Sequence, residues 1–333
     1  MCILVKKKVL VIGGTGTIGK SIVQSIMKEN PTLIKIFSRD EFKQHKLRYE
    51  LDNNEKLRLV IGDIRDYDSL FAAMHDIDYV LHLAAMKHVD LCEYNPYEAI
   101  KTNVQGTNNV IKAAISQNVK KVVFTSSDKA ISPTNTYGAT KLIAERLISS
   151  TEYSTNGKQT IFASVRFGNV MGSRGSVIPL FKEQILKNRK ITVTDNDMTR
   201  FMMSLNQATQ LTIKALKEAK GGEVFVLKMP VIRLGDLADI LIGETCKEHD
   251  MKMDEINVEV MGLRPGEKMY EELMTYDESR EAWELKDMYI IPGTEKVRYN
   301  NAKKCNHGTY SSMNQAPLNV NELRKLLKEE ELI

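Results

Sequence analysis

The chain has 333 residues, of which 42% are hydrophobic and 27% charged, enough for one large α/β domain or two closely joined ones. The net charge of +4 is spread along the chain, so no basic block indicates nucleic-acid binding. The cysteines lack metal-binding or CxxC spacing, and neither a signal peptide nor an apolar run of roughly 20 residues is present. We therefore expect a soluble, cytoplasmic protein with reduced thiols, no metal site and no membrane attachment.

A glycine-rich turn follows the first predicted strand, residues 8–12, and precedes a helix with apolar residues at Ile22, Val23 and Ile26. Such a turn lets the backbone approach a pyrophosphate, whose charge then faces the amides at the helix N-terminus. The glycine spacing fits both GxxGxxG, typical of short-chain dehydrogenase/reductase folds, and GxGxxG. We predict nucleotide binding by Gly13, Thr15, Gly16, Thr17, Ile18 and Gly19.

The second predicted strand, residues 33–37, ends at Ser38 and Arg39, with Lys43 one helical turn further on. The ribose of a dinucleotide would lie here, and an NAD site usually places a carboxylate at this point. A hydroxyl and a guanidinium suit a 2′-phosphate instead, so the pattern favours NADP over NAD. The alternative is that Arg39 and Lys43 are only the solvated start of a helix.

Later strand ends add candidates for both cofactor and substrate contacts. Asp63, beside Ile64, follows strand 57–61 and is positioned either to accept from the adenine amino group or to cap the next helix. The small residues Ala84 and Ala85 follow strand 79–83 and allow close approach to a cofactor. Lys87 and His88 then project toward the substrate side, although a lone histidine is more often structural.

The order of these segments predicts a doubly wound parallel sheet. Strands at 122–125 and 160–166 continue the alternation of strand and helix, and their apolar runs are continuous rather than alternating. The segment 96–116 is predicted to be one long helix with Ala99, Ile100 and Asn103 on a single face. Asn103 is an unusual polar member of that face, and we expect it to bond a loop backbone and brace the site.

The main candidate for chemistry is the polar cluster between strand 122–125 and the helix that begins near Tyr137. Tyr137 and Lys141 are four residues apart and share one helix face. A nearby ammonium stabilises a phenolate, which can accept a hydroxyl proton while Ser127 hydrogen-bonds the same oxygen. Asp128 and Lys129 could supply an acid and a base for removing water beside a ketone, or could form a plain salt bridge at a helix start.

Past residue 166 the sequence becomes richer in loops. Arg174, Arg200 and Arg264 are well separated basic positions there, and they suggest either a clamp for a phosphorylated ligand or scattered surface arginines. We assign residues 1–166 to a nucleotide-binding Rossmann domain, to which strand 221–228 returns. Residues 167–292 then form a smaller, loop-rich α/β substrate domain. Residues 293–333 form a polar tail, expected to be a loop or surface arm, and a final helix that docks on its own domain or on another subunit.

In combination, these segments resemble the UDP-N-acetylglucosamine 4,6-dehydratases, extended short-chain dehydrogenase/reductases of bacterial surface-glycan and flagellin-sugar pathways. The resemblance covers about residues 8–292. It rests on Ser127-Asp128-Lys129, Tyr137-Gly138-Ala139-Thr140-Lys141, residues 166–176, Met198-Thr199-Arg200-Phe201 and Arg264-Pro265-Gly266-Glu267-Lys268. Relatives acting on dTDP-glucose carry Asp-Glu at positions 128 and 129, so Lys129 points to UDP-N-acetylglucosamine.

The resemblance implies NADP as cofactor, bound in part by residues 38–41, and a role for each matching residue. Lys129 would be the base at C5 of the sugar and Asp128 the acid at C6, while Tyr137 and Lys141 would oxidise C4. Lys87 and Asn169 would face the sugar and diphosphate, and UDP would be held by Arg174, Ser176, Arg200, Arg264 and Glu267. We add His88 and Thr194 as further candidate substrate contacts. The product would be a UDP-4-keto-6-deoxy sugar for surface-glycan or nonulosonic (pseudaminic) acid biosynthesis. The family also usually forms homo-oligomers.

Two questions stay open at the level of sequence. Tyr137 is similar to the residue found in members that invert the configuration at C5. The sequences Ser126-Ser127-Asp128-Lys129-Ala130 and Pro133-Thr134-Asn135 are more similar to those of members that retain this configuration. A UDP-sugar 4-epimerase would share the fold, the cofactor and Tyr137 with Lys141, but would not need Asp128 and Lys129. A non-catalytic NADP-sensing protein would usually lose the tyrosine–lysine pair, which this chain keeps.

Overall fold

The computed structural model describes residues 3–151, 160–293, 299 and 301–333. Cys2 and part of the predicted tail (294–298 and 300) therefore lie outside the described residues, whereas Cys92, Cys246 and Cys305 are free thiols. In this part of the chain no helix is long and apolar enough to cross a membrane.

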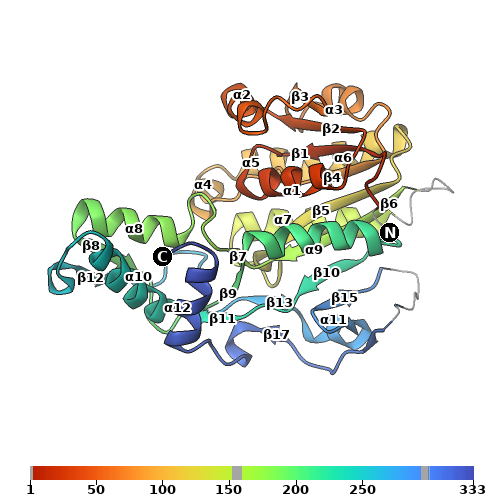
Figure 1. Ribbon diagram of the computed structural model, residues 1–333. Coiled ribbons are helices and arrows are strands. Elements are labelled where there is room, and N and C mark those ends of the chain that lie inside the picture. Colours follow the sequence, from red (N-terminus) through yellow and green to blue (C-terminus); the bar gives the residue numbers. More distant parts are fainter. Residues whose placement is uncertain (1–2, 152–159, 294–298, 300) are drawn as a thin grey trace.

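The described residues form a sheet of ten strands. This sheet runs through the centre of the molecule (Figure 1). Its apolar strands lack alternation because helices cover both faces. The parallel strands, in spatial order, are β3 (Leu57–Ile61), β2 (Leu33–Ser38), β1 (Lys8–Ile12), β4 (Tyr79–His82), β5 (Lys121–Ser127), β6 (Ile161–Phe167) and β10 (Val224–Leu227). Antiparallel strands extend the edge beyond β10, namely β15 (Met288–Ile291), β14 (Trp283–Glu284) and β16 (Lys303–Lys304). The predicted α/β class with a parallel sheet is confirmed.

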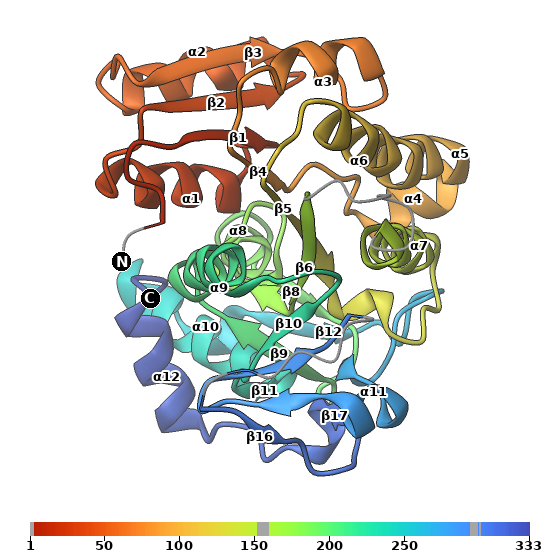
Figure 2. The ribbon, with the colours of Figure 1, turned by 90° about the vertical axis from the view of Figure 1, so that its right-hand side faces the viewer.

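Helices lie on both faces of this sheet (Figure 2). One apolar core joins α1 (Thr17–Lys28) and α9 (Leu205–Glu218) to the sheet. A second core joins α3 (Tyr67–Ala73), α6 (Gly106–Ser116) and α7 (Thr136–Ser150) to the opposite face. The other helices of this half are α2 (Glu41–Glu50), α4 (Val89–Tyr94) and α5 (Pro96–Ala99).

The helix predicted for residues 96–116 is not α-helical throughout, because its middle has a different geometry. A π-helical segment, Ile100–Gln105, separates α5 from α6. The wider turn inserts an extra residue and rotates the face, so that Asn103 is buried while Ile100 is 40% exposed. The prediction that Ile100 lies on the buried face was therefore wrong.

A smaller apolar core lies beyond the carboxyl end of the central sheet. Its helices are α8 (Val177–Asn188), α10 (Leu234–Glu248) and α12 (Val320–Glu329). Short sheets accompany them: β7 (Asn169–Val170) with β9 (Thr199–Met203) and β11 (Val231–Arg233), β8 (Lys190–Val193) with β12 (Asn257–Val260), and β13 (Glu272–Met274) with β17 (Tyr310–Ser311). The short helix α11 (Tyr276–Glu281) and the 3₁₀ turns Met253–Glu255 and Ser312–Asn314 complete this part of the chain.

Two features of the C-terminal segment refine the expectations. The final helix α12 packs on its own chain, with Leu323 and Leu327 buried against the core that contains α10. The described part of the preceding tail is not merely a surface arm: β16 extends the central sheet, β17 pairs with β13, and Tyr310 is buried. Two-residue strands carry too few alternating positions to be recognised from sequence.

Candidate active site

A cavity of about 830 Å³ opens at the carboxyl ends of the parallel strands, and we call it the strand-end cavity. Most of the predicted site residues line it. They are Gly13, Thr15, Gly16, Thr17, Ile18, Gly19, Ser38, Arg39, Lys43, Asp63, Ile64, Ala84, Ala85, Lys87, His88, Ser127, Asp128, Lys129, Tyr137, Lys141, Asn169, Arg174 and Ser176. The other predicted substrate contacts, Thr194, Arg200, Arg264 and Glu267, are not among its lining residues.

The glycine turn at one end of the cavity has the geometry of a phosphate cradle. Gly13 has φ +83°, a conformation that side chains disfavour, and its carbonyl accepts from the Gly16 amide at 3.0 Å. A Cβ at Gly19 would lie 2.4 Å from the Gly13 carbonyl oxygen, so only glycine fits. The turn leads directly into α1, whose first amides face the cavity end where an anion would lie.

At the end of β2, Arg39 is exposed and its Nη1 lies 3.7 Å from Asp63 Oδ2. Asp63 is bound by its neighbour Arg65, whose backbone amide and Nε donate to the carboxylate at 3.0 and 2.9 Å. Burial opposes ionisation of Asp63, but the bonds from Arg65 outweigh it and lower the pKa of Asp63. The alternative role of Asp63 as a helix cap is wrong, because Asp66 caps α3.

The polar cluster at the end of β5 is tightly interconnected. The Ser127 hydroxyl donates to Asp128 Oδ1 at 2.7 Å, and the Lys129 amide donates to the same oxygen at 2.8 Å. The Asp128 side chain is buried, and its Oδ2 has no hydrogen-bond partner among the described residues. An unpaired buried oxygen is costly, so the arrangement favours a carboxyl group that acts on a ligand.

Lys129 lies between two carboxylates. Its Nζ is 3.2 Å from Asp128 Oδ1 and 3.2 Å from Glu271 Oε1. Burial opposes the ammonium form, but these two carboxylates outweigh it and raise the pKa of Lys129 above its usual value. Sequence reasoning did not identify Glu271, although one weak signal existed: Glu271 and the apolar Leu273 alternate with Glu272, and alternation predicts that both face inward.

Tyr137 and Lys141 are both buried in the first turns of α7. Burial raises the pKa of Tyr137, and a hydrogen bond with Ser127 and the charge of Lys129 partly offset this. Burial also lowers the pKa of Lys141 to about 7, with Glu145 partly opposing it. The Lys141 ammonium donates to the Thr125 carbonyl and lies 4.1 Å from the centroid of the Phe124 ring.

The predicted brace at Asn103 is confirmed. Asn103 Oδ1 accepts from the Met86 amide at 2.8 Å, and its Nδ2 donates to the Met86 carbonyl at 3.0 Å. The same Nδ2 also donates to Thr140 Oγ1 at 3.0 Å. The π-helical segment thus fixes the loop after β4 against α7, the helix that carries Tyr137.

Replacing Asn103 by leucine should destabilise the protein by about 1–3 kcal/mol, because the Met86 amide and carbonyl lose their partners. The free energy of unfolding in urea measures this. Gln105→Leu is the matched control, since Gln105 is exposed in the same π-helical segment. Equal stability of the two variants would contradict the bracing role.

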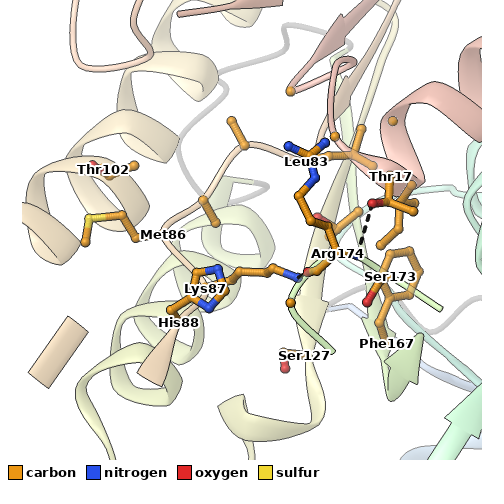
Figure 3. A pocket seen from close by; sticks show the side chains of 18 of the residues that line it. Thr17, Leu83, Met86, Lys87, His88, Thr102, Ser127, Phe167, Ser173 and Arg174 are labelled. Carbon is orange, nitrogen blue, oxygen red and sulfur yellow. Dashed lines mark hydrogen bonds between the residues drawn. The ribbon is translucent and has the colours of Figure 1, made fainter. Parts of the chain in front are cut away.

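On the other wall, residues 173–176 approach both the glycine turn and the loop after β4. Figure 3 shows Lys87 reaching the Arg174 backbone, where its Nζ donates to the carbonyl at 3.0 Å. The Arg174 amide in turn donates to Thr17 Oγ1 at 3.4 Å. A Cβ at Gly175, which has φ +73°, would meet the His88 ring at 2.9 Å, so His88 packs against this loop.

The remaining basic positions lie outside the strand-end cavity, and Arg200 is bonded within the protein. Arg200 donates to the carbonyls of Thr199 and Lys268, both at 2.8 Å. The Gly266 carbonyl accepts from Asn135 Nδ2 at 2.9 Å, which ties loop 264–268 to the start of α7. Arg264 is exposed, and its backbone amide donates to the Glu267 carboxylate at 3.2 Å.

Comparison with known proteins relates most of the chain to one protein family. The family model described as "Polysaccharide biosynthesis protein" matches residues 9–293. An X-ray structure of Pen from Bacillus thuringiensis is 59% identical and superposes with a TM-score of 0.95, covering 99% of this chain and 100% of that one.

Curated relatives carry differing names. A UDP-N-acetylglucosamine 4,6-dehydratase (inverting) of Campylobacter jejuni is 41% identical over 86% of this chain and 83% of its own length. A UDP-glucose 4-epimerase of Rickettsia rickettsii is 39% identical over 97% of this chain and 96% of its own. An uncharacterized membrane protein of Methanocaldococcus jannaschii is 47% identical over 97% of this chain and 96% of its own.

Proposed function

The chain belongs to the polysaccharide biosynthesis protein family, and from this membership and the geometry of the site we propose that it is an NADP-dependent UDP-N-acetylglucosamine 4,6-dehydratase. The observation that carries the proposal is Lys129, whose Nζ lies 3.2 Å from the buried carboxylate of Asp128 and borders the same cavity as Tyr137. Oxidation at C4 alone needs no acid–base pair at this place, whereas loss of water across C5 and C6 needs both.

The residues divide the proposed reaction between them. Tyr137 takes the proton of the C4 hydroxyl, Ser127 hydrogen-bonds the same oxygen, and the ammonium of Lys141 favours the phenolate. The nicotinamide cofactor supplies hydride acceptance and return. Lys129, in its neutral form, removes the C5 proton, which the C4 ketone has made acidic. Asp128, in its protonated form, gives its proton to the departing C6 hydroxyl, which leaves as water.

The resting pair holds the right number of protons for this step. An ammonium on Lys129 and a carboxylate on Asp128 become a neutral amine and a carboxylic acid when one proton moves across the 3.2 Å contact. Elimination then restores the ion pair, because the amine gains the C5 proton and the acid loses its own. The proton arrives on Asp128 Oδ1, so this oxygen is the one that would pass it to the departing C6 hydroxyl.

The cavity walls fit a dinucleotide. Only glycine fits at positions 13 and 19 of the cradle, and Arg39 and Lys43 border the cavity where a 2′-phosphate would lie. The positive charges favour NADP over NAD.

Arg39→Ala should weaken NADP binding by on the order of tenfold and leave NAD binding unchanged, because the guanidinium, which lies 3.7 Å from Asp63, would meet the cofactor only at its 2′-phosphate. Fluorescence titration of the reduced cofactors measures both affinities. Arg58→Ala, on neighbouring strand β3, is the control. Equal losses for the two cofactors would show that Arg39 does not discriminate between them.

The rival activity is 4-epimerisation of a UDP-sugar, which the Rickettsia relative's name suggests. Incubation with UDP-N-acetylglucosamine decides between the two, because dehydration gives a product about 18 mass units lighter and epimerisation leaves the mass unchanged. An unchanged mass with an inverted C4 would overturn the dehydratase proposal. Proton NMR of the fresh product, through its C5 couplings, then distinguishes inversion from retention.

A further inference from the structure

The geometry points to Glu271 as a positioning residue that serves as the second counter-ion of Lys129 and thereby controls the basicity of that amine. This inference rests on the proposed function, since it matters for catalysis only if Lys129 is the base. None of the sequence motifs used above includes Glu271.

Glu271 is buried beside Lys129. Its side chain is 4% exposed, and its Oε1 lies 3.2 Å from Lys129 Nζ. The Glu271 amide donates to Ser312 Oγ at 3.0 Å, while the Ser312 amide donates to the Glu271 carbonyl at 2.9 Å. These bonds attach the Glu271 backbone to the C-terminal segment, while the buried carboxylate has Lys129 and Arg200 as its cationic partners.

The charged and titratable groups around Lys129 come from four parts of the chain. Asp128 precedes it, Tyr137 lies on α7, Arg200 lies on β9, and Glu271 precedes β13. Of these, Asp128, Glu271 and, more weakly, Tyr137 favour the ammonium, while Arg200 opposes it. Removing the charge of Glu271 would leave Asp128 as the main group that favours the ammonium.

Arg200 gives Glu271 an alternative partner. Its Nε lies 3.7 Å from Glu271 Oε1, so the buried carboxylate keeps a cation beside it when Lys129 is neutral. Burial by itself raises the pKa of Glu271, and Lys129 and Arg200 both oppose this. When Lys129 gains the C5 proton, Glu271 stabilises the new ammonium, and Asp128 does not have to be its sole partner.

The charge state of Lys129 can be measured without any reaction. Lys129 is 25% exposed on its side chain and therefore within reach of a small reagent. Competitive acetylation with acetic anhydride, followed by peptide mapping, gives its rate relative to Lys325, which is 78% exposed on α12. Glu271→Gln is compared with Glu272→Gln, the neighbouring carboxylate in β13.

At pH 9, acetic anhydride should acetylate Lys129 on the order of tenfold faster in Glu271→Gln than in the wild type. A pKa of Lys129 lowered by about one unit would give about ten times more neutral amine. The rate in Glu271→Gln should also level off at a lower pH. Glu272→Gln should match the wild type. A rate for Glu271→Gln within twofold of the wild type at every pH, or one that is raised without levelling off earlier, would overturn the inference.

A second measurement ties the amine to the reaction. In heavy water, the rate of deuterium exchange at C5 should fall on the acid side of its pH profile. This fall should move to lower pH in Glu271→Gln and stay in place in Glu272→Gln. If Glu271→Gln changes the acetylation of Lys129 but not the pH profile of C5 exchange, then Glu271 acts on Lys129 but Lys129 is not the C5 base. Absence of exchange in the wild type would reject the proposed function, while acetylation still decides the role of Glu271.

Discussion

Lys129→Ala is expected to lower the rate of water loss from UDP-N-acetylglucosamine by at least about 10²–10⁴-fold, the usual contribution of a positioned base. The C5 proton should also stop exchanging with heavy water, because the ε-amine is the group that would carry it. Oxidation at C4 should survive, since Tyr137 and Lys141 lie on the separate helix α7. Mass spectrometry of the product and NMR of C5 measure the two losses.

The control for this variant has to separate chemistry from folding. Removing the Lys129 ammonium leaves the buried carboxylates of Asp128 and Glu271 without their shared cation, which itself costs stability. Calorimetric titration with UDP should therefore show that the variant still binds the nucleotide. Lys112→Ala, an exposed lysine on α6, should behave as the wild type. Dehydration at the wild-type rate in Lys129→Ala would remove Lys129 from the mechanism.

Local pattern was sufficient to predict the parts of the site that are local in sequence. The glycine turn needs Gly13 and Gly19 because one backbone conformation and one close contact exclude side chains. Asn103 was recognisable because a polar residue interrupts an apolar face, and burial without a partner would be costly. Its brace is confirmed by both bonds to Met86.

Long-range pairing was beyond reach of the sequence. Glu271 meets Lys129 only because β13 and the Ser312 turn bring it back to the end of β5. Periodicity gives the face of a strand, but it does not say which distant cation that face will meet. The π-helical turn that exposes Ile100 was missed for a related reason, because an inserted residue changes the period without leaving a mark in residue type.

The second large effect is expected at Arg166, where Arg166→Met should lower the free energy of unfolding by about 3–5 kcal/mol. Arg166 is fully buried on β6. Its Nη2 lies 2.6 Å from Glu145 Oε1 and 2.6 Å from Glu278 Oε1, and its Nη1 donates to the Leu273 carbonyl at 2.9 Å. It thus joins α7, which carries Tyr137, to α11 and β13, and removal leaves two carboxylates without their cation.

The loss in free energy of unfolding of Arg166→Met should depend on pH, and the titration of Glu278 determines whether it grows or shrinks as the pH falls. Burial opposes ionisation of Glu278, but the bonds from Arg166 outweigh it and lower its pKa. In the wild type this pair therefore stabilises the fold above about pH 4.3, the usual glutamate value, and the contribution is lost as the pH falls through the lowered pKa. In Arg166→Met the bond from the Thr275 amide and the charge of Arg146 remain, but the bonds that outweighed burial are lost. The pKa of Glu278 should therefore rise, and its protonation should remove an unpaired buried charge.

The deficit of Arg166→Met relative to the wild type should accordingly be largest near pH 7 and shrink toward pH 5. Urea unfolding at both pH values measures it, with Arg280→Met, an exposed arginine on the same helix as Glu278, as the control. A variant that also carries Glu145→Gln and Glu278→Gln should recover much of the loss, because neither carboxylate is then left without Arg166 and the amide at position 278 can keep the bond from Thr275. Packing rather than charge would make Arg166 necessary if the loss in free energy of unfolding stayed constant with pH. The same would follow if the triple replacement increased that loss.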